Sequence, residues 1–273
     1  MLFEHMEYFM SPKVYVGAMS PTGGTAKVAS LLAQGFRACG QSVSEFSFLT
    51  PAQRALPPQF SPDDIAIFCF PVFAGRVPKC LTAWPQLQGH GAKAVVGAVY
   101  GNRACDDATR EMVAILHDHG FKVIASAELI AQHSLIPQLA AGRPDAEDAN
   151  WLHHFAAQIM QVVAQDVAEI AIDRSPYLPY GPTPYPILLD PARCKQCKVC
   201  SRFCPQQLIG VGGVADDERL KAECLNCQAC VARCPYHNRA LPNQVQTMMA
   251  PMLKQIWRNN QARKENRACF GEA

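Results

Sequence analysis

Apolar runs alternate with segments of helical periodicity over the first 170 positions of the chain. Continuous apolar runs, typical of strands covered on both faces, occur at Val14–Met19, Ile65–Phe70, Ala94–Tyr100 and, more weakly, Lys122–Ile130. Apolar residues at helical spacing predict helices at Thr25–Cys39, Ala104–His119 and Asp145–Ile170. Ser42–Leu49 is an ambiguous candidate for a second strand. The alternation predicts an α/β fold, with a parallel sheet covered by helices on both sides.

A proline-rich segment divides the chain. Five prolines lie between Ser175 and Pro186, a density that excludes a helix or a central strand and predicts a stiff, extended connector. We therefore expect an α/β domain over residues 1–174, a linker over 175–186 and a second domain over 187–243. Residues 244–273 are expected to form a C-terminal helix followed by a basic tail.

Composition narrows the function classes. The net charge is +2 and no long basic block is present, which argues against a nucleic-acid partner. No apolar run reaches the length of about 18 residues that a membrane span needs. The first residues lack the basic segment of a signal peptide. These features, together with cysteines whose spacing suits metal binding, favour a cytoplasmic location.

Eight of the 13 cysteines stand in two copies of one pattern, C-x2-C-x2-C-x3-C-P. The first copy is Cys194, Cys197, Cys200 and Cys204, and the second is Cys224, Cys227, Cys230 and Cys234. This is the bacterial iron–sulfur run, so two copies predict two [4Fe–4S] clusters. Zinc is the simpler alternative, but a zinc site uses only four ligands. Disulfides fit poorly in a chain long enough to fold without them.

Residues 187–243 resemble the bacterial two-cluster ferredoxin family, which implies a small α+β domain. In that family the fourth cysteine of each run binds the other cluster. The resemblance therefore implies one cluster on Cys194, Cys197, Cys200 and Cys234, and the other on Cys204, Cys224, Cys227 and Cys230. The chain departs from the family where glycine often follows the second cysteine, because Lys198 and Gln228 stand there. Residues 206–223 are expected to form the connecting hairpin.

The loop after the first expected strand reads Ser20-Pro21-Thr22-Gly23-Gly24-Thr25 and opens a helix. Two glycines and three hydroxyl residues at a helix N-terminus favour an anion, because backbone N–H groups and the helix dipole point at it. The loop is neither a Walker A motif nor G-x-G-x-x-G, so a single phosphate fits better than a pyrophosphate. A plain capped turn is the alternative.

Two more loops follow strands, at the edge of the sheet where ligands of open α/β folds bind. They read Pro71-Val72-Phe73-Ala74-Gly75-Arg76-Val77-Pro78 and Tyr100-Gly101-Asn102-Arg103-Ala104-Cys105-Asp106-Asp107. With the first loop, they resemble the family in which a flavodoxin-like domain is fused to a two-cluster ferredoxin. The resemblance implies a doubly wound, parallel, five-stranded sheet of order 2-1-3-4-5, with bound FMN.

The same resemblance assigns roles to the three loops. The phosphate is expected at Ser20, Thr22, Gly23, Gly24 and Thr25. One side of the isoalloxazine would be bordered by Pro71, Val72, Phe73, Ala74 and Gly75, and the other by Tyr100, Gly101, Asn102 and Arg103. Arg76 or Arg103 could stabilise a flavin anion or could be a solvated charge. His133 and Cys105 are expected to be structural rather than reactive.

The chemistry predicts a redox function, because clusters carry one electron each whereas a flavin takes one or two. Our main hypothesis is intramolecular electron transfer between two [4Fe–4S] clusters and FMN, with an external redox protein as partner. A flavin-dependent oxidoreductase of a small organic substrate is an alternative, so it is open whether the chain is an enzyme. A third possibility is a scaffold with a degenerate flavin pocket. The sequence indicates neither the direction of electron flow nor the oligomeric state.

Overall fold

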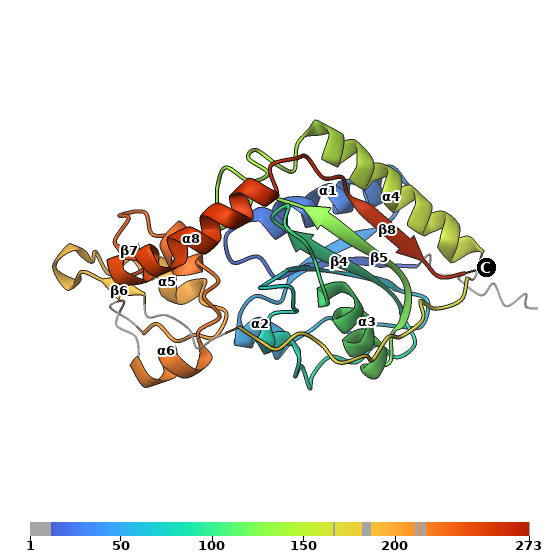
Figure 1. Cartoon of the computed structure of the whole chain (residues 1–273). Helices are drawn as coiled ribbons and strands as arrows, with labels where there is room; N and C mark the ends of the chain where they lie inside the picture. Colours follow the sequence, from blue (N-terminus) through green and yellow to red (C-terminus); the bar gives the residue numbers. More distant parts are fainter. Residues whose placement is uncertain (1–11, 166, 182–186, 211–212, 214–216, 273) are drawn as a thin grey trace, which may run out of the picture.

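The computed structural model describes residues 12–165, 167–181, 187–210, 213 and 217–272. Its larger part is built on a six-stranded sheet of order β2-β1-β3-β4-β5-β8 (Figure 1). The strands are β1 (Val14–Ala18), β2 (Val43–Ser47), β3 (Ile65–Pro71), β4 (Lys93–Tyr100), β5 (Lys122–Ile130) and β8 (Arg267–Phe270). The first five strands pair in parallel. Their order is that of the flavodoxin-like doubly wound fold, as the sequence predicted.

Helices cover both faces of the sheet, each over its own apolar core. On one face lie α1 (Gly24–Ala38) and α4 (Ala146–Ala164), which bury Leu32, Phe36 and Phe155 against the sheet (Figure 1). On the other face, α3 (Ala108–Asp118) packs with the aromatic residues around Phe68. The short helix α2 (Pro51–Arg54) lies on this side too. The central strands read as unbroken apolar runs because both of their faces are buried.

Helix α4 is shorter than the predicted segment 145–170. Its start agrees, because the Asp145 side chain accepts hydrogen bonds from the backbone of Glu147 and Asp148 and so caps the first turn. Its end does not, because Ile170 donates its backbone N–H to Val123. Ile170 packs against the core of the opposite face. The apolar residues after α4 therefore belong to an extended segment that packs along the sheet, and they do not form a further turn of helix.

The sheet has six strands, not the five predicted. Strand β8 pairs antiparallel with β5, with Ala125 opposite Phe270 and Glu128 opposite Arg267. The predicted basic tail is thus partly a strand of the larger sheet. An unpaired outer strand exposes a row of backbone hydrogen-bonding groups, and β8 satisfies those of β5. Only four residues long, β8 has no alternating pattern that would mark it in the sequence.

The C-terminal lobe holds both cysteine runs. Strands β6 (Leu188–Leu189) and β7 (Arg239–Ala240) form an antiparallel pair. Around them lie η2 (Pro191–Arg193), α5 (Val199–Arg202), α6 (Asp217–Glu223) and α7 (Ala229–Ala232). The connecting segment 206–223, expected as a hairpin, ends in α6, and its residues 211, 212 and 214–216 lie outside the described part. A small 3-10 turn, η1 (Lys79–Leu81), belongs to the larger domain.

The last helix, α8 (Asn243–Asn259), begins beside β7 and runs from the C-terminal lobe to the larger domain, where β8 follows (Figure 1). The expected C-terminal helix is therefore present, and it links the two parts of the molecule. In the described part of the chain, no helix has the length and apolar character that crossing a membrane requires.

Candidate metal centre and cofactor loops

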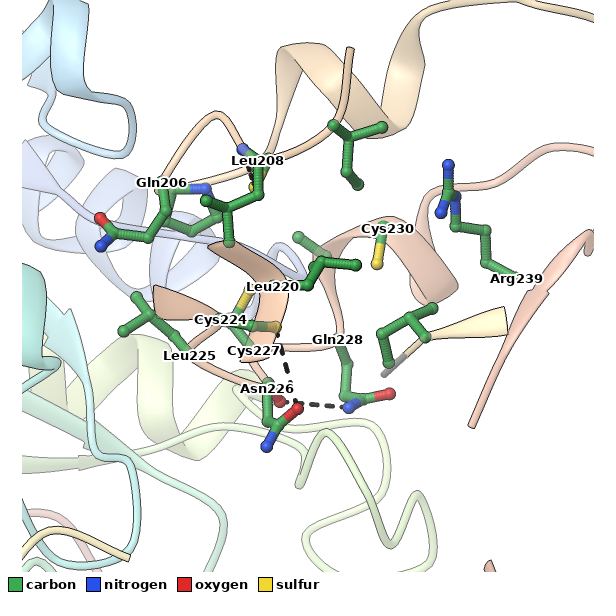
Figure 2. Close-up of a pocket in the computed structure, with 15 residues that line it drawn as sticks. Gln206, Leu208, Leu220, Cys224, Leu225, Asn226, Cys227, Gln228, Cys230 and Arg239 are labelled. Carbon is green, nitrogen blue, oxygen red and sulfur yellow. Dashed lines mark hydrogen bonds between the residues drawn. The ribbon is translucent and has the colours of Figure 1, made fainter. Parts of the chain in front are cut away.

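Four cysteines from both runs line one cavity, which we call the inner cavity. They are Cys204, Cys224, Cys227 and Cys230 (Figure 2). Its other walls are mainly apolar and include Ile187, Leu208, Ile209, Leu220 and Leu225. The structure thus brings Cys204 of the first run beside the first three cysteines of the second run.

The remaining four cysteines line a second cavity, which we call the outer cavity. They are Cys194, Cys197, Cys200 and Cys234. Its other walls are more polar and include Lys195, Gln196, Lys198, Tyr236 and Asn238. Cys197 is solvent-exposed, whereas none of the four cysteines of the inner cavity is. The two cavities therefore offer different surroundings to whatever they bind.

The internal repeat is visible in the backbone. Three pairs of residues, each thirty positions apart, have positive φ: Gln196 and Asn226, Lys198 and Gln228, Gln207 and His237. The fourth cysteine of each run accepts a backbone N–H from the residue four positions later. Leu208 donates to Cys204 Sγ over 3.4 Å, and Asn238 donates to Cys234 Sγ over 3.3 Å. Such N–H donors stabilise negative charge on sulfur.

The donor set fits iron–sulfur clusters. In the described part of the chain, no group of three or more His, Cys, Asp or Glu side chains is arranged to hold a single metal ion. The four cysteines of each cavity instead line a hollow. A [4Fe–4S] cluster takes four thiolate ligands, so each cavity supplies one complete set.

Burial sets the proton affinity of the inner thiols. It raises the pKa of Cys224 and Cys227, and it raises the pKa of Cys230 to about 12. The positive charge of Arg239 opposes the shift at Cys230. Without a bound cation these thiols hold their protons at neutral pH. Metal binding must therefore displace protons from this cavity.

The inner cavity lies against the larger domain. Phe203 and Leu225, which neighbour the inner-cavity ligands in sequence, pack on the apolar core beneath α3. Arg54 at the end of α2 is buried, and its guanidinium donates to the carbonyls of Leu49 (2.7 Å) and Pro205 (2.9 Å). Arg54 thus ties a loop of the larger domain to the residue that follows Cys204.

A second arginine reaches the other way, from the cluster lobe to the first loop. Arg233 lies between Cys230 and Cys234 and donates to the backbone carbonyls of Ser20 (3.1 Å) and Pro21. Its guanidinium also lies over the Phe203 ring, 3.9 Å from the centroid. Desolvation lowers the pKa of Arg233.

The first loop has the shape of an anion cradle. Gly23 has φ 107°, a conformation that favours glycine, and a Cβ on Gly24 would lie only 3.2 Å from Ala131. The hydroxyl of Ser20 accepts the N–H of Ala26 at 2.9 Å, and Thr25 is buried. The first turn of α1 therefore presents backbone N–H groups that the helix does not use, a geometry that suits one phosphate.

The second loop is a tight turn. Phe73 and Arg76 form an isolated antiparallel bridge, and Ala74 and Gly75 between them have positive φ. The backbone N–H of Asp107 donates to the Gly75 carbonyl at 2.9 Å, so the second and third loops touch. Pro71, Val72 and Phe73 are half-buried at the end of β3.

Arg76 serves the connector. It is buried, and it pairs with Glu111 of α3 through two hydrogen bonds of 2.8 and 2.6 Å. It also donates to the Leu178 carbonyl and lies 4.2 Å from the centroid of the Tyr180 ring. The contacts with Leu178 and Tyr180 hold the proline-rich segment on the larger domain, and the pair with Glu111 fixes the guanidinium for them, so Arg76 has a structural role in this arrangement.

The third loop is engaged by the C-terminal segment. Asn102 is buried, and its amide donates to the carbonyls of Asn260 (2.7 Å) and Ala262 (2.9 Å). Its side-chain oxygen accepts the N–H of Lys264. Both amide hydrogens of Asn102 are thus used by the segment between α8 and β8.

The neighbours of Asn102 have separate environments. A Cβ on Gly101 would lie 2.6 Å from His133, so only glycine allows these two loops to approach. Arg103 forms an ion pair with Asp106, and burial raises the pKa of Tyr100 to about 12. Cys105 is buried, and its pKa is raised by burial. Tyr100 thus ends β4, and Gly101 and Arg103 follow it at the edge of the sheet.

Three arginines of this region were not singled out by the sequence: Arg54, Arg233 and Arg239. Each acts on residues far along the chain, so no spacing rule marks it. Only Arg239 could have been noticed in the sequence. The repeat places an apolar residue, Ile209, thirty positions earlier, so a charged residue at the equivalent position is unexpected.

Comparison with known proteins gives a family match in the C-terminal lobe. Residues 186–235 match the family described as the 4Fe-4S dicluster domain. No curated protein matched the chain by sequence.

Among solved structures, the chain is similar to a flavodoxin of Streptococcus pneumonia TIGR4 at 18% identity and a TM-score of 0.36, over 56% of this chain and 99% of that chain. It is similar to oxidised Flavodoxin 2 of Bacillus cereus at 16% identity and a TM-score of 0.39, over 56% and 99%. A third similarity is to rubredoxin oxygen:oxidoreductase of Desulfovibrio gigas at 16% identity and a TM-score of 0.39, over 57% and 37%.

Proposed function

Because the chain joins a flavodoxin-like fold to a 4Fe-4S dicluster domain, we propose that it transfers electrons between two [4Fe–4S] clusters and FMN. The inner cavity would bind one cluster through Cys204, Cys224, Cys227 and Cys230. The outer cavity would bind the other through Cys194, Cys197, Cys200 and Cys234. When bound, each cluster carries one electron and the flavin takes up one or two.

The observation that carries this proposal is the docking of the inner cavity on the larger domain. Phe203 and Leu225 pack against that domain's core, and Arg54 donates a hydrogen bond to the Pro205 carbonyl. Arg233, within the same cysteine run, contacts the Ser20–Pro21 loop. A cluster in the inner cavity would therefore lie beside the loops that we assign to FMN. Packed protein, rather than a layer of water, would lie between the cluster and the flavin.

The contrast between the cavities suggests an order for the electrons. Cys197 of the outer cavity is exposed, and so are the neighbouring Lys195 and Lys198. These features support an external redox protein as partner at the outer cavity, with the inner cavity between it and the flavin. The protein's part is to hold the sites in this order and to keep water away from the inner one.

The flavin site of the proposal is the sheet edge beyond β1, β3 and β4. We assign the phosphate to Ser20, Thr22, Gly23, Gly24 and Thr25, where the start of α1 supplies N–H donors. Pro71, Val72, Phe73, Ala74 and Gly75 would border one side of the ring. Tyr100, Gly101 and Arg103 would border the other, while Asn102 would act there through its backbone.

The first experiment is an anaerobic preparation of the full chain with iron, acid-labile sulfide and flavin determined together. We expect about eight iron atoms and one FMN per chain. Zinc in place of iron, or no bound metal at all, would end the proposal. A protein with iron but without flavin after addition of FMN would limit it to the clusters.

Serine variants test which cysteines act together. In Cys204→Ser we expect the cluster of the inner cavity to be impaired, although Cys204 belongs to the first cysteine run. Cys234→Ser should affect the outer cavity instead. Their distinct spectra, compared with Cys224→Ser and Cys194→Ser, assign each remote cysteine. If Cys204→Ser matched Cys194→Ser rather than Cys224→Ser, the crossed arrangement would be wrong.

A further inference from the structure

Arg239 is a buried cation that lines both cavities. It lies on β7, whose pairing with β6 places it opposite Leu189. Its side chain is 5% exposed, and Figure 2 shows it beside Cys230 at the wall of the inner cavity. No other arginine or lysine of the chain lines the two cavities in common within the described part.

The hydrogen bonds of Arg239 are incomplete. One terminal nitrogen donates to the Gly213 carbonyl and lies 3.6 Å from Cys200 Sγ, an outer-cavity ligand in the proposal. Its Nε is buried and finds no hydrogen-bond partner among the described residues. A buried, unpaired N–H of a charged group is costly, so this donor calls for an acceptor that the described residues do not supply.

The repeat shows that the fold does not need a cation at this place. Arg239 follows Cys234 by five positions, as Ile209 follows Cys204. Both side chains are 5% exposed, but Ile209 is apolar and lines only the inner cavity. An apolar residue thus meets the packing requirement of the position. The arginine in the second half adds charge and a donor where the two cavities meet.

We propose that Arg239 is a charge shared by both clusters, which makes each of them easier to reduce and so offsets the repulsion between electrons held on the two. This inference rests on the proposed function. A cubane with four thiolates is an anion that becomes more negative on reduction, and its potential depends on net charge and on hydrogen bonds to sulfur. A cation fixed between two such groups favours the reduced state of both.

The consequence is a protein able to hold two electrons at once, one in each cavity. The electrons come one at a time from two molecules of a one-electron donor protein, each of which is oxidised once. No bond forms or breaks in this loading. Two stored electrons match the two that a flavin takes up. Arg239 would therefore help the protein to collect electrons singly from a donor and to pass two of them to the flavin.

The test is a redox titration of the anaerobic full chain with dithionite, followed by electron paramagnetic resonance. The main variant is Arg239→Ile, which copies Ile209, and Arg239→Lys keeps the charge but removes Nε. Arg219→Ile is the matched control, at an exposed arginine on α6. Iron is counted first in every protein, so loss of clusters is seen before potentials are compared.

We expect both midpoint potentials to shift to more negative values in Arg239→Ile, to shift less in Arg239→Lys, and to stay unchanged in Arg219→Ile. If Arg239→Ile does not retain iron, the midpoint potentials of Arg239→Gln are compared with those of the wild type instead. Unchanged potentials in an iron-replete variant would overturn the inference, and a shift of one cluster alone would overturn the shared role. Wild-type protein without iron would instead overturn the proposed function.

Discussion

The guanidinium of Arg233 donates a hydrogen bond to the backbone carbonyl of Ser20, across 3.1 Å. These two residues are 213 positions apart in the sequence. Arg233 lies between two cysteines of the second run, and Ser20 lies in the loop after β1. The contact fixes the cluster lobe on the loop that we assign to the FMN phosphate.

Replacing Arg233 should loosen this docking. In Arg233→Gln the charged donor to Ser20 and Pro21 is lost, and hydrogen bonds to charged groups contribute about 1.5–3 kcal/mol. We expect slower flavin reduction after rapid mixing with dithionite, at unchanged iron content. The contact with the Phe203 ring is lost as well. Because the Ser20–Pro21 loop loses these hydrogen bonds, FMN should also bind more weakly.

Arg202→Gln is the control for that variant, because Arg202 is an exposed arginine at the end of α5 in the same lobe. It should leave both readouts unchanged. Equal effects of the two substitutions would mean that charge in general, rather than the contact with Ser20, couples the two parts.

Two residues of the cluster loops adopt a conformation that favours glycine. Lys198 has φ 62° and Gln228 has φ 61°, at the positions where related ferredoxins often carry glycine. A left-handed conformation costs a residue with a Cβ about 1–2 kcal/mol. Glycine in turn lowers the free energy of unfolding by about 0.4–1 kcal/mol, because it increases the conformational entropy of the unfolded chain. Lys198→Gly should therefore stabilise the protein by about 0.5–1 kcal/mol.

The midpoint of cluster loss on heating, followed by visible absorption, measures this gain. An increase of about 2 °C is expected for Lys198→Gly. Lys195→Gly is the matched control, because the φ of Lys195 is not positive and the same substitution there should lower the midpoint. Destabilisation by both changes would show that the conformation at Lys198 carries no strain.

The sequence predicted well those helices and strands whose hydrophobic pattern corresponds to a single burial environment. β3 and β4 are buried on both faces and appear as unbroken apolar runs, and the spacing of Leu32 and Phe36 marks the buried face of α1. β2 was ambiguous because its residues are only half-buried or exposed. β8 was missed because backbone pairing with β5, rather than side-chain burial, makes it a strand.

The cysteines of the candidate site could be predicted because their spacing repeats, whereas the residues that position them could not. Arg54 acts on Pro205 across 151 positions of chain, and local patterns carry no record of such a contact. Asn102 was expected near the flavin, and its amide is directed to the carbonyls of Asn260 and Ala262. Its partner segment was expected only as part of a C-terminal helix and basic tail, so nothing in the sequence opposed the simpler expectation.

Asn102 should hold the C-terminal segment in place. Asn102→Gly removes the side chain without adding strain, because φ is 65° there. The carbonyls of Asn260 and Ala262 lose their donors, at a cost of about 1–3 kcal/mol. We expect faster hydrogen exchange of the β8 amides, whose pairing with β5 depends on the segment before it. Asn259→Ala, at an exposed residue of α8, should leave that exchange unchanged.

His133 gives the protein a specific pH dependence. Its Nδ1 accepts the backbone N–H groups of Leu135 and Ile136, each at 3.1 Å, so the ring must be unprotonated at this atom. Burial, and to a lesser extent the positive charge of Arg103, lowers the pKa of His133 from its ordinary 6.5. The unfolded chain therefore binds the proton more readily than the folded one.

The sign follows from that difference. The contribution of His133 to stability is complete above pH 6.5 and is lost as the pH falls from there through the lowered pKa of the folded state. His133→Asn keeps an acceptor for Leu135 but does not titrate. We expect the melting temperature of the wild type to fall more steeply than that of His133→Asn between about pH 7.5 and 5.5. His90→Asn, at an exposed histidine with φ 50°, should retain the wild-type slope. Parallel curves for the wild type and His133→Asn would show that protonation of this ring is not linked to folding.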